Sequence, residues 1–239
     1  MQVLYKLSKY YLDIIDHLVN TELEVNFLDK IFKKYNVKTI LDVACGVGRH
    51  TIGLTKKNYQ VVGIDFSPSQ IKQARKNSKK TNTRVKFFIK NANSFTFPTR
   101  FDAAICMWST LGEEPMQYRK VIKNVFANLK KGGIFVIDNR SWEYIPKNKA
   151  ETITNVIKNK DNTIKTKIFD RYTENFRVRD VTHNINGKEY RDLCITNILK
   201  EKDWINALKE GGFNKFKVYY DRSFHKVKKP KYVTIIAIM

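Results

Sequence analysis

The sequence predicts an α/β fold in which a doubly wound, mostly parallel sheet of seven strands carries a small inserted antiparallel sheet. Short apolar runs such as 40–44 alternate with amphipathic segments, which is typical of strands buried between helices. The region 150–199 instead alternates with period two, which indicates antiparallel strands. The runs at 216–220 and 232–238 form a closing hairpin pair, so the last strand of the large sheet should be antiparallel.

The individual elements follow from apolar runs and from recognisable helix ends. A capping-box pattern, Thr-Glu-Leu-Glu over 21–24, starts the first helix, and Gly46 and Gly48 lead from the first strand directly into a second helix. Ser67 followed by Pro68 predicts an N-cap and the first position of the next helix. Strands are expected at 40–44, 61–65, 85–89, 101–107, 134–138, 216–220 and 232–238, and the other helices at 21–35, 68–79, 115–131 and 204–209.

The chain of 239 residues is long enough for one large domain with an insertion. We expect residues 1–146 and 200–239 to form the large α/β unit. Residues 147–199 should form the inserted antiparallel sheet, which would cover the rim where the parallel strands end. Asn186-Gly187 is the strongest short hairpin signal within this insertion.

The chain is strongly basic. It has 45 Lys and Arg residues against 23 Asp and Glu residues, a formal net charge of +22. The densest basic run, 72–90, falls on the helix expected at 68–79 and on the strand after it. Such a charge is typical of nucleic-acid-binding proteins, but no aromatic residues are interleaved on that helix for base stacking. The pattern therefore favours a solvated face over a nucleic-acid footprint.

Several features concern the cellular compartment. No stretch reaches the roughly 20 apolar residues of a membrane span, and the start over 1–6 lacks the apolar core of a secretory signal. Cys45, Cys106 and Cys194 are far apart and have neither metal nor disulfide spacing. We expect a cytoplasmic protein with no membrane partner and no metal, and the sequence carries no signal for the oligomeric state.

The turn Cys45-Gly46-Val47-Gly48 and the end of the next strand predict a nucleoside site. The two glycines let the backbone pass close to a ligand, and the carboxylate of Asp65 can accept two hydrogen bonds from a ribose diol. A dinucleotide site needs a third glycine, but Arg49-His50-Thr51 follows instead. Asp42, inside the first strand, would repel a pyrophosphate and attract an ammonium group. The expected ligand therefore carries a ribose and a positive charge.

With these residues the chain resembles the class I S-adenosylmethionine-dependent methyltransferases. Their acidic-x-Gly-x-Gly-x-Gly loop and second-strand acid match Asp42, Gly46, Gly48 and Asp65, while Ala44 replaces the first glycine. The resemblance implies a Rossmann-like fold, S-adenosylmethionine as cofactor and methyltransferase activity. The cofactor-binding residues that it implies are Asp42, Ala44, Gly46, Gly48, Arg49, Asp65, Phe66, Asn91, Ala92, Asn93, Cys106 and Trp108.

Some of these assignments have structural alternatives. Asn91-Ala92-Asn93 stands where the family often has Gly-Asp-Ala, so Asn91 would accept from the adenine amino group through its amide oxygen. Cys106 also reads as a buried strand residue, and Trp108 as a packing residue.

A closer resemblance is to the glycine and sarcosine N-methyltransferases and to their relatives that methylate amino sugars. It is carried by the runs 41–46 and 136–145, and it extends over nearly the whole chain. The glycine enzymes have Asp-His-Arg-Asn-Tyr-Asp in the second run, and their arginine binds the substrate carboxylate, a role that falls to Arg140 by match. An ion pair of Arg140 with Asp138 or Glu143 is the structural alternative. Ser109 stands where those enzymes have a substrate-contacting asparagine, which departs from their pattern.

The resemblance implies transfer of a methyl group to the amine of a small molecule, such as glycine or sarcosine. Arg140, Trp108 and Ser109 would bind this acceptor. Tyr11, from an N-terminal segment over 5–16 that would form a lid, and Ser109 could orient or accept the amine proton. The alternative function is an RNA methyltransferase acting on tRNA or rRNA, which the charge suggests. The Asn/Asp-Pro-Pro-aromatic run of base-amine enzymes and the Pro-Cys pair of cytosine-C5 enzymes are both absent after the fourth strand.

Overall fold

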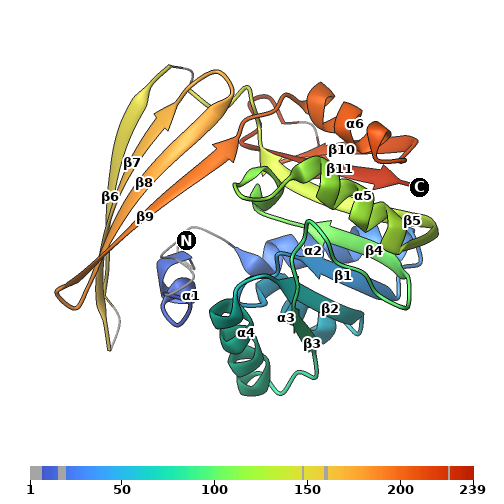
Figure 1. The fold of residues 1–239 in the computed structure, drawn as a ribbon, viewed down its shortest axis with the longest axis horizontal. Helices are drawn as coiled ribbons and strands as arrows, with labels where there is room; N and C mark the ends of the chain where they lie inside the picture. The colour runs from blue at the N-terminus through green and yellow to red at the C-terminus, as the bar shows by residue number, and fades with distance from the viewer. Residues whose placement is uncertain (1–6, 16–19, 147, 159–160, 226) are drawn as a thin grey trace.

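A computed structural model describes residues 7–15, 20–146, 148–158, 161–225 and 227–239, and shows two β-sheets (Figure 1). Residues 5, 6 and 16 of the expected lid segment, and residues 147, 159 and 160 of the expected insertion, lie outside the described residues. The seven strands of the large sheet are β1 (Thr39–Val43), β2 (Gln60–Asp65), β3 (Lys86–Ile89), β4 (Phe101–Cys106), β5 (Leu129–Arg140), β10 (Lys215–Tyr220) and β11 (Tyr232–Ile238). The four strands of the second sheet are β6 (Ala150–Lys158), β7 (Thr163–Tyr172), β8 (Phe176–Ile185) and β9 (Lys188–Asn197).

The strand order of the large sheet is β10-β11-β5-β4-β1-β2-β3. β1 pairs in parallel with both β2 and β4, and β4 pairs in parallel with β5. β11 runs antiparallel between β10 and β5, which confirms the predicted fold class. The chain winds outward in one direction through β2 and β3 and in the other through β4 and β5. The carboxyl ends of β1 and β4 therefore flank the switch point, where ligands bind in such sheets.

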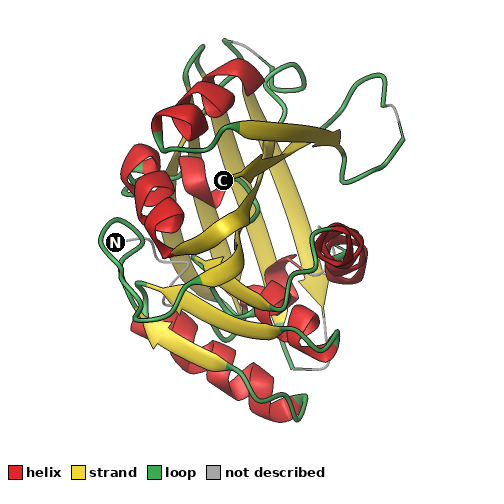
Figure 2. Cartoon of the chain, turned by 90° about the vertical axis from the view of Figure 1, so that its right-hand side faces the viewer, coloured by secondary structure: helices red, strands yellow, loops and turns green. Residues whose placement is uncertain are grey.

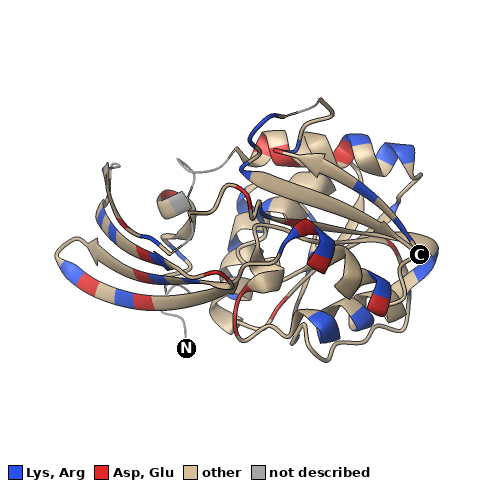
Figure 3. Cartoon of the chain, turned by 90° about the horizontal axis from the view of Figure 1, so that it is seen from above, with Lys and Arg blue, Asp and Glu red and all other residues tan. Residues whose placement is uncertain are grey.

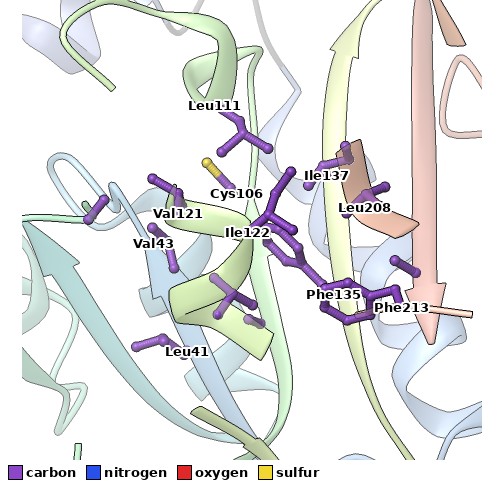
Figure 4. Packing of buried hydrophobic residues seen from close by; sticks show 14 of the residues in the cluster. Leu41, Val43, Cys106, Leu111, Val121, Ile122, Phe135, Ile137, Leu208 and Phe213 are labelled. Atoms are coloured by element: carbon purple, nitrogen blue, oxygen red, sulfur yellow. The ribbon is translucent and has the colours of Figure 1, made fainter. Parts of the chain in front are cut away.

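The helices cover both faces of the large sheet (Figure 2). Successive residues on a strand point to opposite faces, so Ile40 packs with α2 and α3, and Leu41 packs with α5 and α6. Figure 4 shows the second of these cores, where Val121 and Ile122 of α5 approach the strands. The helices are α1 (Tyr11–Ile15), α2 (Thr21–Lys34), α3 (Arg49–Lys56), α4 (Pro68–Lys80), α5 (Tyr118–Asn128) and α6 (Glu201–Glu210), and a 3₁₀ turn, η2, spans Thr110–Gly112.

Helix ends are where the structure differs from the sequence predictions. Ser67 caps α4 as expected, but the N-cap of α2 is Asn20 and not Thr21, because the Asn20 side chain accepts from Leu23 N at 3.0 Å. The helix expected over 115–131 is shorter, since Leu129 already pairs with Phe101 as the first residue of β5.

The inserted sheet packs on the N-terminal segment. Leu7 and Ile14 form one apolar cluster with Ile164 of β7 and Ile185 of β8. In Figure 1 α1 accordingly lies between the inserted sheet and α4. The expected hairpin turn at Asn186-Gly187 joins β8 and β9. Within the described residues, no helix has the length and apolar character needed to cross a bilayer.

Glu24 of α2 ties several elements of the large unit together. Its side chain is 2% exposed and contacts Arg49 at 3.1 Å, His50 at 2.9 Å, Trp108 at 2.8 Å and Arg222 at 3.2 Å. Burial raises the pKa of this carboxyl, but the hydrogen bond and charge of His50 and the charges of Arg222 and Arg49 lower it further, to about 2. One buried carboxylate thus joins α2, α3, the end of β4 and the segment between β10 and β11.

We expect Glu24→Gln to destabilise the fold, because an amide removes the carboxylate that pairs with Arg49 and one of the two that pair with Arg222. A pKa near 2 in place of 4.5 corresponds to about 3 kcal/mol of stability. Since the folded-state pKa is depressed, this contribution is present above pH 4.5 and is lost as the pH falls towards 2. Urea unfolding at pH 7 and at pH 3 measures it, with the exposed Glu22→Gln on the same helix as control. Equal losses in the two variants, or a loss for Glu24→Gln that is the same at both pH values, would contradict this assignment.

Candidate active site

The turn after β1 has an unusual backbone that brings the chain close to a cavity. Ala44, Gly46 and Gly48 have φ angles of 58°, 55° and 83°, in the left-handed region that favours glycine. A side chain at Gly48 would also lie 2.9 Å from the ring of Phe87. The turn therefore requires glycine at this position both for its conformation and for packing, and Ala44 adopts the conformation that a glycine would take most easily.

Asp65 ends β2 beside this turn and is 5% exposed. Its Oδ2 accepts from Gly46 N at 3.0 Å, and its Oδ1 accepts from Ser67 N at 2.9 Å. Burial raises the pKa of Asp65 to about 6, although the two backbone donors act in the opposite direction. The two backbone donors thus fix the carboxylate in position beside the glycine turn.

A cavity of about 330 Å³, which we call the glycine-turn cavity, lies at the carboxyl ends of β1 to β4. Eight residues singled out in the sequence line it: Tyr11, Ala44, Gly46, Asp65, Phe66, Asn91, Ala92 and Asn93. Gln70 of α4, which no sequence pattern indicated, also lines the cavity; it is 2% exposed, and its Oε1 has no hydrogen-bond partner in the structure. The segment 113–117, likewise not indicated by the sequence, closes the cavity from the side of β4.

The loop after β3 is tied to that closing segment. Asn91 Oδ1 accepts from Asn93 N at 2.9 Å, while Asn93 Oδ1 accepts from Gln117 N at 2.8 Å. The Asn93 amide group also donates to the carbonyl of Pro115 at 3.4 Å. Asn93 therefore joins the two sides of the glycine-turn cavity, and Asn91 shapes the turn.

Five of the predicted cofactor residues lie outside the lining of the glycine-turn cavity: Asp42, Gly48, Arg49, Cys106 and Trp108. Asp42 is buried, and its Oδ2 accepts from Thr51 Oγ1 at 2.5 Å. Arg49 pairs with Glu24 and lies 4.9 Å from the ring of Trp108. Cys106 is fully buried in the core shown in Figure 4.

A second cavity, of about 240 Å³, lies between the carboxyl ends of β4 and β5 and the inserted sheet. We call it the arginine cavity, because Arg140 of β5 lines it together with Arg177 and Arg179 of β8. The three predicted acceptor-binding residues, Trp108, Ser109 and Arg140, all line it. The structure therefore separates the two proton-handling candidates, because Ser109 lies here and Tyr11 lies in the glycine-turn cavity.

Arg177 and Arg179 are already partnered. Both guanidinium groups bond the fully buried Asp170, with Nη2 to Oδ2 distances of 2.6 and 2.8 Å. Two cations therefore share the Asp170 carboxylate, and the charge of Arg177 also acts on Glu113, which lines the same cavity. The inserted sheet thus contributes charge as well as cover.

Arg140 is not in either ion pair that the sequence suggested. Asp138 is held by Arg222, with an Nη2 to Oδ2 distance of 2.6 Å, and Glu143 accepts from Ser141 Oγ at 2.7 Å. Among the described residues, no carboxylate lies within 4.0 Å of the Arg140 guanidinium. Its backbone N donates to Ser109 Oγ at 2.9 Å, so Ser109 positions the chain at Arg140.

Two further residues of the arginine cavity were missed. Asn139 is 3% exposed, and its Nδ2 has no hydrogen-bond partner in the structure. A buried donor of this kind usually has an acceptor. Glu113 lines both cavities, and it is the one described residue that does so. The sequence shows Glu113 only as an acidic residue shortly after the fourth strand. Its surroundings come from the inserted sheet, which is distant in the sequence, so no local pattern reveals them.

Part of the sequence matches a known protein family. Residues 40–133, which include the glycine turn and Asp65, match the family model described as a methyltransferase domain. This stretch is a methyltransferase domain of the class I S-adenosylmethionine-dependent type.

The chain is similar to N-methyltransferases in sequence. It is 30% identical to the glycine N-methyltransferase of Rattus norvegicus over 130 residues, which cover 48% of this chain and 44% of that enzyme. It is 28% identical to the glycine/sarcosine N-methyltransferase of Parasynechococcus marenigrum over 137 residues, which cover 54% of this chain and 48% of that enzyme. The matches thus span about half the length of these relatives.

Solved structures share its fold over nearly the whole chain. An S-adenosylmethionine-dependent methyltransferase from Clostridium acetobutylicum superimposes with a TM-score of 0.84 at 18% identity, covering 98% of both chains. The sugar N-methyltransferase KedS8 from Streptoalloteichus sp. superimposes with a TM-score of 0.81 at 16% identity, covering 96% of this chain and 92% of that one. The inserted sheet is therefore part of an architecture found in other methyltransferases.

The residues of the glycine-turn cavity fit the cofactor of this family. S-adenosylmethionine carries hydroxyl and amino donors, and the cavity offers the Asp65 carboxylate and the orphaned Oε1 of Gln70 as acceptors. The left-handed turn at Gly46 has open space toward the cavity, where an added side chain would meet only Gln70 at 3.8 Å. Phe66 is 41% exposed and supplies an apolar surface at the same cavity.

Proposed function

We propose that this methyltransferase transfers a methyl group from S-adenosylmethionine to the amine of a small molecule that carries a carboxylate, such as glycine or sarcosine. The single observation that carries the proposal is the meeting of two different cavities at Glu113. One presents the hydrogen-bond acceptors Asp65 and Gln70, which suit adenosine. The other presents an arginine that has no carboxylate within 4.0 Å among the described residues, and a buried amide donor, both of which suit an anionic group.

In this proposal each residue has a role that follows from its position. Asp65 accepts from the ribose hydroxyls, and Asn91 and Gln70 accept from donors of the cofactor. Arg140 and Asn139 hold the carboxylate of the acceptor, since a guanidinium fork and an amide N–H are both donors to such a group. The sulfonium of the bound cofactor supplies a methyl carbon that is open to in-line attack. The cavity walls then contribute by orienting the amine and excluding water.

The proteins that this chain resembles are named for methylation of nitrogen, which supports an amine acceptor, but they differ in the molecule that carries the amine. The similar rat protein is named for glycine N-methylation, and KedS8 is a sugar N-methyltransferase. A sugar acceptor would not require the unpaired Arg140, so the arginine cavity favours the amino-acid class for this chain.

The net charge of +22 is the observation that favours the competing RNA methyltransferase. Figure 3 shows that Lys and Arg lie on the inserted strands, interspersed with Asp and Glu, and on helices of the large unit. We therefore expect binding to RNA that is weak near physiological salt and falls steeply as salt rises, since each neutralised phosphate adds about 0.9 to the log–log slope.

Labelled S-adenosylmethionine offered with a panel of amino acids, their amines and total RNA tests the proposal. We expect label to appear on a small amino acid. Transfer to one RNA species, with tight binding at physiological salt, would reject this proposal in favour of an RNA methyltransferase. Transfer only to amines that lack a carboxylate would retain the methyltransferase but reject the acceptor class.

A further inference from the structure

Glu113 occupies the boundary between the two cavities because the turn after β4 holds its backbone in place. It follows η2 directly, and its N–H donates to the carbonyl of Thr110 at 3.0 Å. An isolated antiparallel bridge pairs it with Thr196 of β9, and Glu114 N donates to the carbonyl of Ile195 at 2.9 Å. The large unit and the inserted sheet therefore fix this residue from both sides.

The groups around the Glu113 carboxyl come from several elements. β9 contributes the Cys194 thiol, which is its hydrogen-bond partner, and the carboxylate of Asp192, while β8 contributes Arg177. Besides burial, the charge of Glu113 also raises the pKa values of Tyr11 in the N-terminal segment and of Cys106 in β4. Burial raises the pKa of Glu113 to about 7, with Asp192 acting in the same direction and Arg177 and Cys194 in the opposite one.

The other proton-handling candidates are poorly suited to take a proton from an amine. Burial raises the pKa of Tyr11 to about 12, so its hydroxyl stays protonated, and Tyr11 does not line the arginine cavity. Ser109 Oγ already accepts from Arg140 N, and a serine hydroxyl is a very weak base. Among the described residues, Glu113 is the one ionisable group that lines both cavities.

We propose that Glu113 is the general base that takes a proton from the acceptor's ammonium group, an inference that rests on the proposed function. The N–H bond breaks, its electron pair stays on nitrogen, and the proton moves to a Glu113 carboxylate oxygen. The nitrogen lone pair then forms the N–C bond to the methyl carbon, while the C–S bond breaks and its electrons stay on sulfur. Glu113 afterwards releases the proton to water.

A base poised near neutrality suits this step. An amino acid arrives mainly as its ammonium form at pH 7, which has no lone pair for attack. A carboxyl that titrates near the working pH is ionised often enough to accept the proton and acidic enough to release it again. The position between the cavities places this exchange where the amine and the methyl carbon must meet.

The first test is the pH dependence of kcat/KM for Glu113→Gln. We expect a loss of about 100-fold near pH 7, within the range for general-base catalysis, together with loss of the acidic limb of the profile near pH 7. The difference in kcat/KM between wild type and Glu113→Gln should become smaller above the pKa of the acceptor amine, because the amine is already neutral in solution there. Glu113→Asp should keep the acidic limb, and Glu210→Gln, in an exposed pair with Arg119, should match wild type.

The second test needs no turnover. In protein labelled with ¹³C at the glutamate side-chain carboxyl, the NMR signal that Glu113→Gln removes belongs to Glu113. We expect it to titrate near pH 7, and a midpoint near the ordinary 4.5 would overturn the inference. Methyl transfer with equal pH profiles for wild type and Glu113→Gln would overturn it too while leaving the proposed function intact. Absence of transfer to any amine would instead reject the proposed function.

Discussion

Replacing Arg140 with alanine is expected to lower kcat/KM for an amino-acid acceptor by roughly 30-fold to several-thousand-fold. Removing one partner of a desolvated, hydrogen-bonded charge pair costs about 2 to 5 kcal/mol. Among the described residues this guanidinium has no carboxylate within 4.0 Å, although its charge also acts on the buried Asp170. Arg140→Lys should recover part of the loss, because an ammonium group cannot form the planar fork.

Two controls separate substrate binding from folding. Cofactor affinity measured by calorimetry should be unchanged in both Arg140 variants, since this residue lies in the arginine cavity and not in the glycine-turn cavity. Arg171→Ala removes an exposed arginine of the inserted sheet and should leave kcat/KM near wild type. An Arg140→Ala variant as active as Arg171→Ala would mean that Arg140 does not touch the acceptor.

Removing the Asp65 carboxylate is expected to weaken S-adenosylmethionine binding by at least 100-fold. Two ribose hydrogen bonds to a charged acceptor contribute about 1.5 to 3 kcal/mol each. Asp65 also accepts from Gly46 N and Ser67 N, so Asp65→Ala would disturb the turn as well. Asp65→Asn keeps the shape but only one acceptor, so one of the two backbone donors loses its partner, and we expect it to lower the unfolding temperature less than Asp65→Ala does. Unchanged calorimetric affinity in both variants would remove Asp65 from the cofactor site.

The same residue predicts a pH dependence of cofactor affinity. Because burial raises the pKa of Asp65 to about 6, the carboxyl of the free protein becomes protonated below that pH and can no longer accept two hydrogen bonds. The Kd should therefore rise about tenfold for each pH unit below 6 in wild type, and this rise should be absent in Asp65→Asn.

Local signals explain what the sequence predicted well. The apolar runs define the strands of the large sheet, and the glycine turn lies only 17 residues before Asp65, so their approach follows from one βα unit. The N-cap of α2 was misplaced by one residue because Asn20 and Thr21 are both good caps, and only the Asn20 contact to Leu23 decides between them.

Tertiary contacts explain what was missed. Glu113 acquires its surroundings from β8 and β9, whose register no local pattern reveals. Asn139 and Arg140 are neighbours in β5, yet only the packing of the inserted sheet makes a cavity over both. The orphaned Oε1 of Gln70 likewise becomes visible only when α4 is placed against the glycine turn.

The most direct test of the proposed acceptor is a comparison of an amino acid with its decarboxylated amine, in wild type and in Arg140→Ala. If Arg140 holds the carboxylate, wild type should prefer the amino acid by roughly 30-fold or more in kcat/KM, and Arg140→Ala should lose that preference by slowing the amino acid alone. A wild-type enzyme that methylates both equally, or an Arg140→Ala variant that still prefers the acid, would contradict a carboxylate-bearing acceptor bound at Arg140.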